Sequence, residues 1–310
     1  MTEIRPAEIR YIKLGPSGAW SGTCFARGEL HFGYRTERHD FAAKGDWDGV
    51  VAHYVKEGRT PGKARDLARE FRAFYTLGGD CLWITFADRH LWWAFAEPGV
   101  TLLAPEESNG AGGMRRTMDG WRKVNIKGAP LRVDTLSSKL TQLAAYRQTI
   151  CRVSASDYLL RRINAIEEPS VVEAGTARAG MITAAQAMIK QLHWADFETL
   201  VDLILARGGW QRVSVLGGKL PEVDMILEQP TTGERASVQV KSKATQTVLD
   251  EHIANFRRSI TSDRTFFVCH SPEGALSAAN QPGVHLWTDD VLAGVAVKSG
   301  LFDWLMERSA

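Results

Sequence analysis

Three polar residues near the end of the chain have side chains suited to metal-assisted hydrolysis. Asp224 follows Val223, and Gln239 and Lys241 alternate with valines in Val238-Gln-Val-Lys241. Successive side chains of a strand point to opposite faces, so Gln239 and Lys241 share one face. A carboxylate beside a lysine can bind a cation and activate water. Alternation alone leaves a second interpretation open, an edge strand with a solvated polar face.

The segments around these residues predict a mixed sheet flanked by helices. Glu198 lies on the first expected helix, one residue from its apolar stripe. The long helical connection from Lys241 to Thr265 suits a crossover between parallel strands. The expected helices are residues 182–192, 193–205, 247–260 and 289–300, and the expected strands are 210–216, 221–227, 236–241, 265–269 and 284–287.

The order of these motifs resembles the Mrr-like restriction endonucleases of the PD-(D/E)XK superfamily. The resemblance covers roughly residues 190 to 305 and rests on Phe197-Glu198, Gly209-Trp210, Val223-Asp224 and Gln239-Val240-Lys241. It implies a restriction-endonuclease-like α/β fold and Mg²⁺-dependent cleavage of DNA, with Mn²⁺ as a substitute. Glutamine is frequent at the family's second acidic position, so Gln239 is a known variant of the pattern. One departure is that Pro221-Glu222 precedes Val223-Asp224, where family members commonly have a Gly-Asp-Gly-like segment.

The resemblance implies a role for each residue. Asp224 is the first metal ligand, Glu198 a second, and the backbone carbonyl of Val240 a third. Gln239 supplies a neutral amide oxygen, and Lys241 orients or deprotonates the attacking water. Two alternative carboxylates rank behind Asp224, namely Glu222 and Glu228.

The first half of the chain is rich in tryptophan. Short strands are expected at residues 9–14, 19–25 and 29–34, helices at 46–55, 64–75, 137–146 and 156–165, and a hairpin over 81–95. Trp92 and Trp93 are adjacent, so on a strand they must point to opposite faces. Most of the tryptophans are expected in the core, but an aromatic pocket that stacks a flipped base is the alternative. The pocket candidates are Trp20, Trp83, Trp92 and Trp93.

A helix, Gly78-Gly-Asp80 and the aromatic hairpin resemble the PUA-like superfamily, which includes the EVE and YTH domains. That resemblance implies an α+β domain with a β-barrel-like core that reads a modified base. Basic residues flank both regions and are candidates for DNA-backbone contacts, although a role in solubility alone is the alternative. They are Lys219, Lys243, Arg115 and Arg116.

The composition of the chain is compatible with these hypotheses. The chain has 310 residues with a formal net charge of +2, which permits nucleic acid as a partner without arguing for it. Four scattered cysteines form no zinc or redox motif. The sequence shows no signal peptide or membrane span, so we expect a cytoplasmic protein. We predict an aromatic-rich recognition domain at 1–165, a linker at 166–181 and a nuclease domain at 182–310.

These observations predict a modification-dependent restriction endonuclease that acts on double-stranded DNA. Because both strands must be cut and each chain carries one site, a homodimer is expected. Two alternatives remain open. One is a non-catalytic nucleic-acid-binding module on a nuclease scaffold, and the other is a nuclease that acts on RNA or branched DNA.

Overall fold

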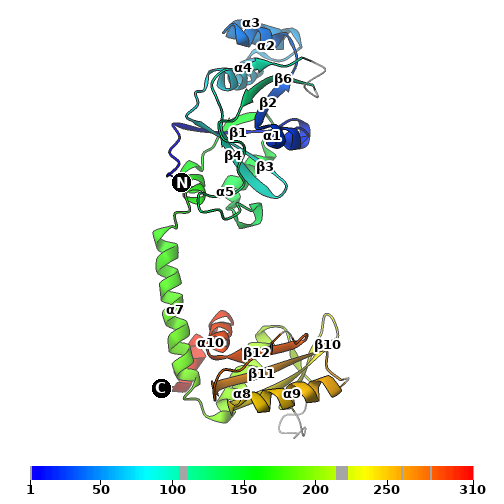
Figure 1. The fold of residues 1–310 in the computed structure, drawn as a ribbon, viewed down its shortest axis with the longest axis vertical. Coiled ribbons are helices and arrows are strands. Elements are labelled where there is room, and N and C mark those ends of the chain that lie inside the picture. Colours follow the sequence, from blue (N-terminus) through cyan, green and yellow to red (C-terminus); the bar gives the residue numbers. More distant parts are fainter. Residues whose placement is uncertain (1, 105–109, 214–222, 260, 280, 310) are drawn as a thin grey trace. The chain divides into compact units, whose positions relative to one another are not determined.

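The computed structural model describes residues 2–104, 110–213, 223–259, 261–279 and 281–309. The chain divides into two compact units, Met1–Glu168 and Pro169–Ala310 (Figure 1). Residues 166–181, predicted to be a linker, span this boundary, and residues 169–181 form the exposed first part of the helix α7. Within the described ranges, no helix is both long enough and apolar enough to cross a membrane.

Two small sheets form the N-terminal unit. One has the order β4-β3-β1-β7, in which only β1 and β3 pair in parallel, and the other has the antiparallel order β2-β6-β5. The strands are β1 (Glu8–Ile12), β2 (Glu29–Tyr34), β3 (Cys81–Ala87), β4 (His90–Phe95), β5 (Thr101–Leu102), β6 (Ala111–Arg116) and β7 (Ile150–Arg152). The helices are α1 (Ser21–Arg27), α2 (Glu37–Ala43), α3 (Trp47–Lys56), α4 (Pro61–Thr76), α5 (Ser138–Thr141) and α6 (Ser156–Ile163), with 3₁₀ turns at Pro16–Gly18, Val133–Thr135 and Gln142–Ala145.

The α+β class of this unit agrees with the expectation, with one local error. Residues 19–25, expected to be a strand, lie mostly in α1, which Gly28 ends at a left-handed φ of 66°. A short apolar run does not distinguish a strand from a helix. The hairpin is confirmed, since Asp88 and Arg89 have φ angles of 49° and 61°, as a tight two-residue turn requires. The two sheets meet at a bridge between Ala96 and Thr117, and a closed barrel stays a prediction.

The C-terminal unit is one five-stranded sheet between helices, with the order β12-β11-β10-β9-β8 (Figure 1). The expected crossover is present, because β10 and β11 pair in parallel and α9 connects them. The strands are β8 (Gln211–Arg212), β9 (Met225–Gln229), β10 (Glu234–Ala244), β11 (Arg264–Pro272) and β12 (Val284–Thr288). The helices are α7 (Pro169–Ile189), α8 (Trp194–Arg207), α9 (Gln246–Arg258), α10 (Asp289–Lys298) and α11 (Phe302–Ser309).

The strand β10 is the centre of this sheet and separates two apolar cores. Val238 and Val240 belong to the larger core, together with side chains of α7, α8, α10 and α11. On the other face, α9 contributes Leu249 to a smaller core against Phe267 of β11. Gln239 and Lys241 alternate with the valines and therefore lie on the α9 face. The edge-strand interpretation is wrong, because β10 has a hydrogen-bonded neighbour on each side.

Arg115, predicted to contact DNA, is instead a buried structural residue. It is 1% exposed, and burial lowers the pKa of its guanidinium. The guanidinium donates hydrogen bonds to four backbone carbonyls, those of Phe74, Gly78, Ala96 and Glu97. A buried charge is tolerated when its hydrogen bonds are satisfied, which explains this position at the junction of α4, β4 and β6. Local sequence did not indicate it, because its partners come from two distant segments.

We expect Arg115→Ala to lower the free energy of unfolding by about 3 kcal/mol or more, because several buried carbonyls would lose their donor. Arg116→Ala is the matched control, since this neighbouring arginine is exposed and its loss should change stability by less than about 0.5 kcal/mol. Chemical denaturation of both variants measures the difference. Equal stabilities would contradict the structural role of Arg115.

Candidate active site

Asp224 is fixed to the central strand by its own side chain. It directly precedes β9, and its backbone N–H donates to the carbonyl of Val238 at 2.9 Å. One carboxylate oxygen, Oδ2, accepts the backbone N–H of Val240 at 2.6 Å and also the side-chain amide of Gln239. Charge-assisted bonds of this kind hold a carboxylate in one orientation. The structure thus brings together Asp224 and Gln239, as the sequence predicted.

Glu198 is electrostatically coupled to Asp224, Arg212 and Lys241. The pKa of Glu198 is raised by burial and, next, by the negative charge of Asp224, while Arg212 and Lys241 lower it. These influences require four charged side chains to lie in one neighbourhood. The Lys241 side chain is half-buried, and it makes no hydrogen bond or ion pair with any residue in the described part of the chain.

This donor set suits a hard divalent cation. Asp224 and Glu198 provide two carboxylates whose mutual repulsion a cation would relieve, and the oxygens of Gln239 and Val240 are neutral candidates beside them. Among the described residues, no three His, Cys, Asp or Glu side chains are grouped as a metal cluster. Metal binding by this site accordingly remains a proposal.

Two residues near the site were not assigned a role from the sequence. Arg212 of β8 donates to the backbone carbonyl of Asp224 at 3.4 Å and lowers the pKa of Glu198. His252 of α9 lies 2.7 Å from the hydroxyl of Thr265, and burial lowers its pKa to about 4, so it is neutral at neutral pH. The pKa of His252 also responds to both Asp224 and Lys241. On α9, His252 comes three residues after the buried Leu249, and this helical spacing could have indicated from the sequence that the His252 side chain is buried.

The remaining candidates of the C-terminal unit lie elsewhere. Lys243 is exposed two residues beyond Lys241, a position compatible with a backbone phosphate. Glu228 forms an ion pair with Arg235 at 3.3 Å, so its carboxylate is already engaged. Two other predicted residues, Lys219 and Glu222, lie outside the described residues.

The four candidate tryptophans of the N-terminal unit differ in their exposure. Trp20, Trp83 and Trp93 are 5%, 0% and 2% exposed and are packed in the apolar cores, so none presents a free ring face. Trp92 is half-buried and stacks on Phe25 with 3.9 Å between ring centroids. Adjacent tryptophans thus enter opposite cores, as the strand alternation required. Trp92 alone among the four has an accessible part.

Comparison with known proteins agrees with the C-terminal assignment. Residues 189–295 match the model of the Mrr catalytic family, described as restriction endonuclease, which confirms the Mrr-like resemblance of this region. The search of curated protein sequences finds no match. The solved structure of the MspJI restriction endonuclease in complex with a 27-mer oligonucleotide is similar over 80% of this chain and 69% of that chain, with 13% sequence identity and a TM-score of 0.29.

We expect Asp224→Asn to lower the pKa of Glu198, because the substitution removes the negative charge that raises it. A pH titration of the glutamate side-chain carboxyl groups by ¹³C NMR measures the change. Glu228→Gln is the control and should leave the pKa of Glu198 unchanged, since Glu228 pairs with Arg235. If Asp224→Asn has no effect, the two carboxylates do not share a site.

Proposed function

We propose that the protein is a modification-dependent DNA endonuclease that hydrolyses phosphodiester bonds with a divalent metal ion, Mg²⁺ or Mn²⁺. The observation that carries the proposal is the constellation on and beside β10. Asp224 is anchored there next to Gln239, with Lys241 and Glu198 in the same electrostatic neighbourhood. The restriction-endonuclease match at residues 189–295 supports the same reaction class.

Each residue of the site has a distinct part in the proposed reaction. A bound divalent ion supplies charge neutralisation at the phosphate and a more acidic water. Asp224 and Glu198 hold the ion, and the hydrogen bonds from Val240 and Gln239 keep Asp224 from rotating away. Lys241 orients the attacking water and offsets the negative charge that develops on the phosphate. The oxygen of the attacking water would form a new P–O bond as the P–O bond to the leaving oxygen breaks. The water would give up one proton, and the leaving oxygen would take one up.

The N-terminal unit is proposed to select the DNA by recognising a modified base. Its α+β fold and aromatic content support this role, and Trp92 beside Phe25 is the candidate for a stacking contact. Arg116 and Lys243, which are exposed, are candidates for contacts with phosphates. Cleavage of both strands by one site per chain calls for a homodimer.

Loss of the anchored carboxylate or of the lysine should abolish cleavage. We expect Asp224→Asn and Lys241→Met each to slow DNA cleavage by about a thousandfold, because each removes a group that acts on the charge of the transition state. Chelation with EDTA should stop the wild type, and added Mg²⁺ or Mn²⁺ should restore it. Plasmid cleavage measures the rates, with Glu228→Gln as a control of unchanged activity. Full activity of Asp224→Asn would refute the catalytic assignment.

Base recognition is tested on full-length protein that carries Asp224→Asn, so that binding is measured without cleavage. Duplexes containing methylated or hydroxymethylated cytosine, methylated adenine, or only unmodified bases are compared by fluorescence anisotropy. We expect at least one modified duplex to bind about tenfold more tightly, the size of effect that one well-placed contact produces. Trp92→Phe should reduce this preference, whereas Trp194→Phe on the exposed surface of α8 should not. Equal affinity for every duplex contradicts the recognition role.

A further inference from the structure

One surface of the N-terminal unit, formed by α4 and the segment around β7, groups five arginines. This unit has more Lys and Arg than Asp and Glu residues, whereas the C-terminal unit, which contains the candidate active site, has fewer. Because every nucleotide of a duplex carries a negative phosphate, electrostatic attraction to DNA depends mainly on the N-terminal unit. The five residues, called the arginine surface below, are Arg65, Arg69, Arg72, Arg147 and Arg152.

Three of these arginines form a row along α4. Arg65, Arg69 and Arg72 follow one another at intervals of four and three residues, which places them on the same side of the helix. All three are exposed, because the buried side of α4, with Phe71 and Phe74, packs in an apolar core. Seven residues of an α-helix span about 10 Å, so the row presents its positive charges to solvent along a line of that length.

The other two arginines are held beside α4 by Glu70. This residue of α4 is 7% exposed, and its Oε2 accepts the backbone N–H groups of Thr149 and Ile150 at 3.0 and 3.1 Å. Arg147 and Arg152 lie two residues before and two residues after this pair, and both are exposed. Glu70 therefore fixes the two arginine-bearing segments to each other.

A hollow of about 310 Å³ lies between the two segments. Its lining includes Arg69 of α4, Arg152 of β7 and Arg10 of β1. The side chains of Arg69 and Arg152 are 75% and 77% exposed, so a ligand can reach them from solvent. Two carboxyl groups, those of Asp66 and Glu70, also line the hollow. Because burial raises the pKa of Glu70 to about 7, this group is only partly ionised at neutral pH, and positive charge predominates.

The ion pairs of these arginines are not an obstacle to phosphate binding. Asp66 contacts Arg69, and Glu8 contacts Arg152 at 2.8 Å. Ion pairs with a largely exposed partner contribute little to stability, so a phosphate can replace either carboxylate at a small cost in free energy. Among the described residues, the side chains of Arg65 and Arg72 form no ion pair.

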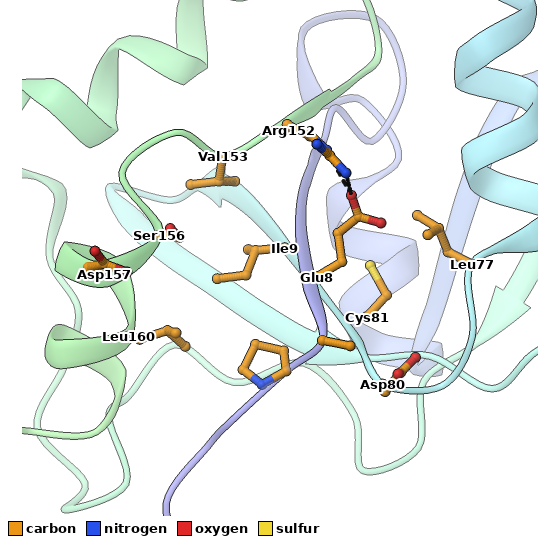
Figure 2. A pocket seen from close by; sticks show the side chains of 12 residues that line it. Glu8, Ile9, Leu77, Asp80, Cys81, Arg152, Val153, Ser156, Asp157 and Leu160 are labelled. Atoms are coloured by element: carbon orange, nitrogen blue, oxygen red, sulfur yellow. Dashed lines mark hydrogen bonds and ion pairs between the residues drawn. The ribbon is translucent and has the colours of Figure 1, made fainter.

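The arginine surface ends at Arg152. This residue also lines a larger pocket of about 600 Å³, where Figure 2 shows it turned toward Glu8. The other charged side chains that line this pocket, among the residues described, are the carboxylates of Asp80 and Asp157. Three carboxylates against one arginine would repel a phosphate. The surface that suits phosphates is therefore the side of Arg152 next to α4.

We propose that the arginine surface binds the phosphate backbone of duplex DNA and holds the duplex without regard to its base sequence. This inference rests on the proposed function, which makes DNA the substrate. Arginine suits the role, because its planar guanidinium can donate two hydrogen bonds to one phosphate. Phosphate contacts position a duplex and base contacts select it, so this surface and Trp92 have separate tasks.

The placement is compatible with base recognition at Trp92. Trp92 is on β4 and Arg152 on β7, at opposite edges of a four-stranded sheet. With about 4.8 Å between neighbouring strands, about 14 Å separates the two edges, which is the length of about four base pairs. Trp92 and Ile150 pack in the same apolar core, and strand alternation puts Arg152 on the face of Ile150. One duplex is long enough to reach both residues.

The test measures how DNA binding depends on salt. Binding of a short unmodified duplex to full-length protein that carries Asp224→Asn is followed by fluorescence anisotropy over a range of salt concentrations. Each lost phosphate contact lowers the slope of log K against log salt concentration by about 0.9. We expect Arg65→Gln combined with Arg72→Gln to lower the slope by about 2 and to weaken binding about tenfold at constant salt.

Arg5→Gln combined with Arg132→Gln is the matched control. These arginines of the same unit have side chains that are 79% and 55% exposed, they lie outside the arginine surface, and their loss removes the same amount of charge. The control should keep the wild-type slope. Equal effects of the two double variants would indicate only a general attraction of charge and overturn the inference. An unchanged slope in Arg65→Gln with Arg72→Gln, or a wild type that binds no duplex, overturns it as well.

Two further measurements separate this inference from the proposed function. Arg65→Gln with Arg72→Gln should weaken modified and unmodified duplexes by the same factor, because phosphate contacts carry no sequence information, and a changed preference contradicts the proposed role. An unchanged salt slope in a protein that cuts modified DNA refutes the arginine surface alone. A lowered slope in a protein whose wild type cuts no DNA refutes the nuclease function alone.

Discussion

The C-terminal site depends on one hydrogen-bonded carboxylate. Asp224 stands outside the regular pairing of β9, and its Oδ2 is held by the backbone of Val240 and the amide of Gln239 on β10. Because β10 is packed between two apolar cores, this anchor has the rigidity of the sheet centre. The second carboxylate oxygen takes no part in these two bonds.

A neutral glutamine is well suited to this position. A carboxylate in place of Gln239 would stand beside Asp224 and repel it, whereas the amide donates to it. The second negative charge comes instead from Glu198 on α8, where Arg212 and Lys241 partly balance it. The site thus contains two carboxylates, Asp224 and Glu198, and two positively charged side chains, Arg212 and Lys241. A phosphate that enters together with a positive ion would add charges of both signs to this set.

Two of the buried ionisable residues of the N-terminal unit, Arg115 and Glu70, differ in how fully their hydrogen bonds are satisfied. The guanidinium of Arg115 donates hydrogen bonds to four backbone carbonyls, so Arg115 has a structural role. Among the described residues, Glu70 has hydrogen-bond donors for one carboxylate oxygen only, and its other oxygen is buried without a partner. The difference is one of hydrogen-bond satisfaction, since both residues are almost fully buried.

The sequence by itself determined the order and periodicity of the helices and strands in the C-terminal unit. Strand alternation in Val238-Gln-Val-Lys241 and the helical stripe around Phe197 are local properties, so the sheet and the crossover followed from the order of such segments. The association of Asp224 with Gln239 came from the order of the motifs in the family resemblance. Only the tertiary structure decided the roles of Arg115, Glu70 and His252. Whether a charged or titratable side chain is exposed or buried depends on segments far away in the chain, and those segments also provide or withhold its hydrogen-bond partners.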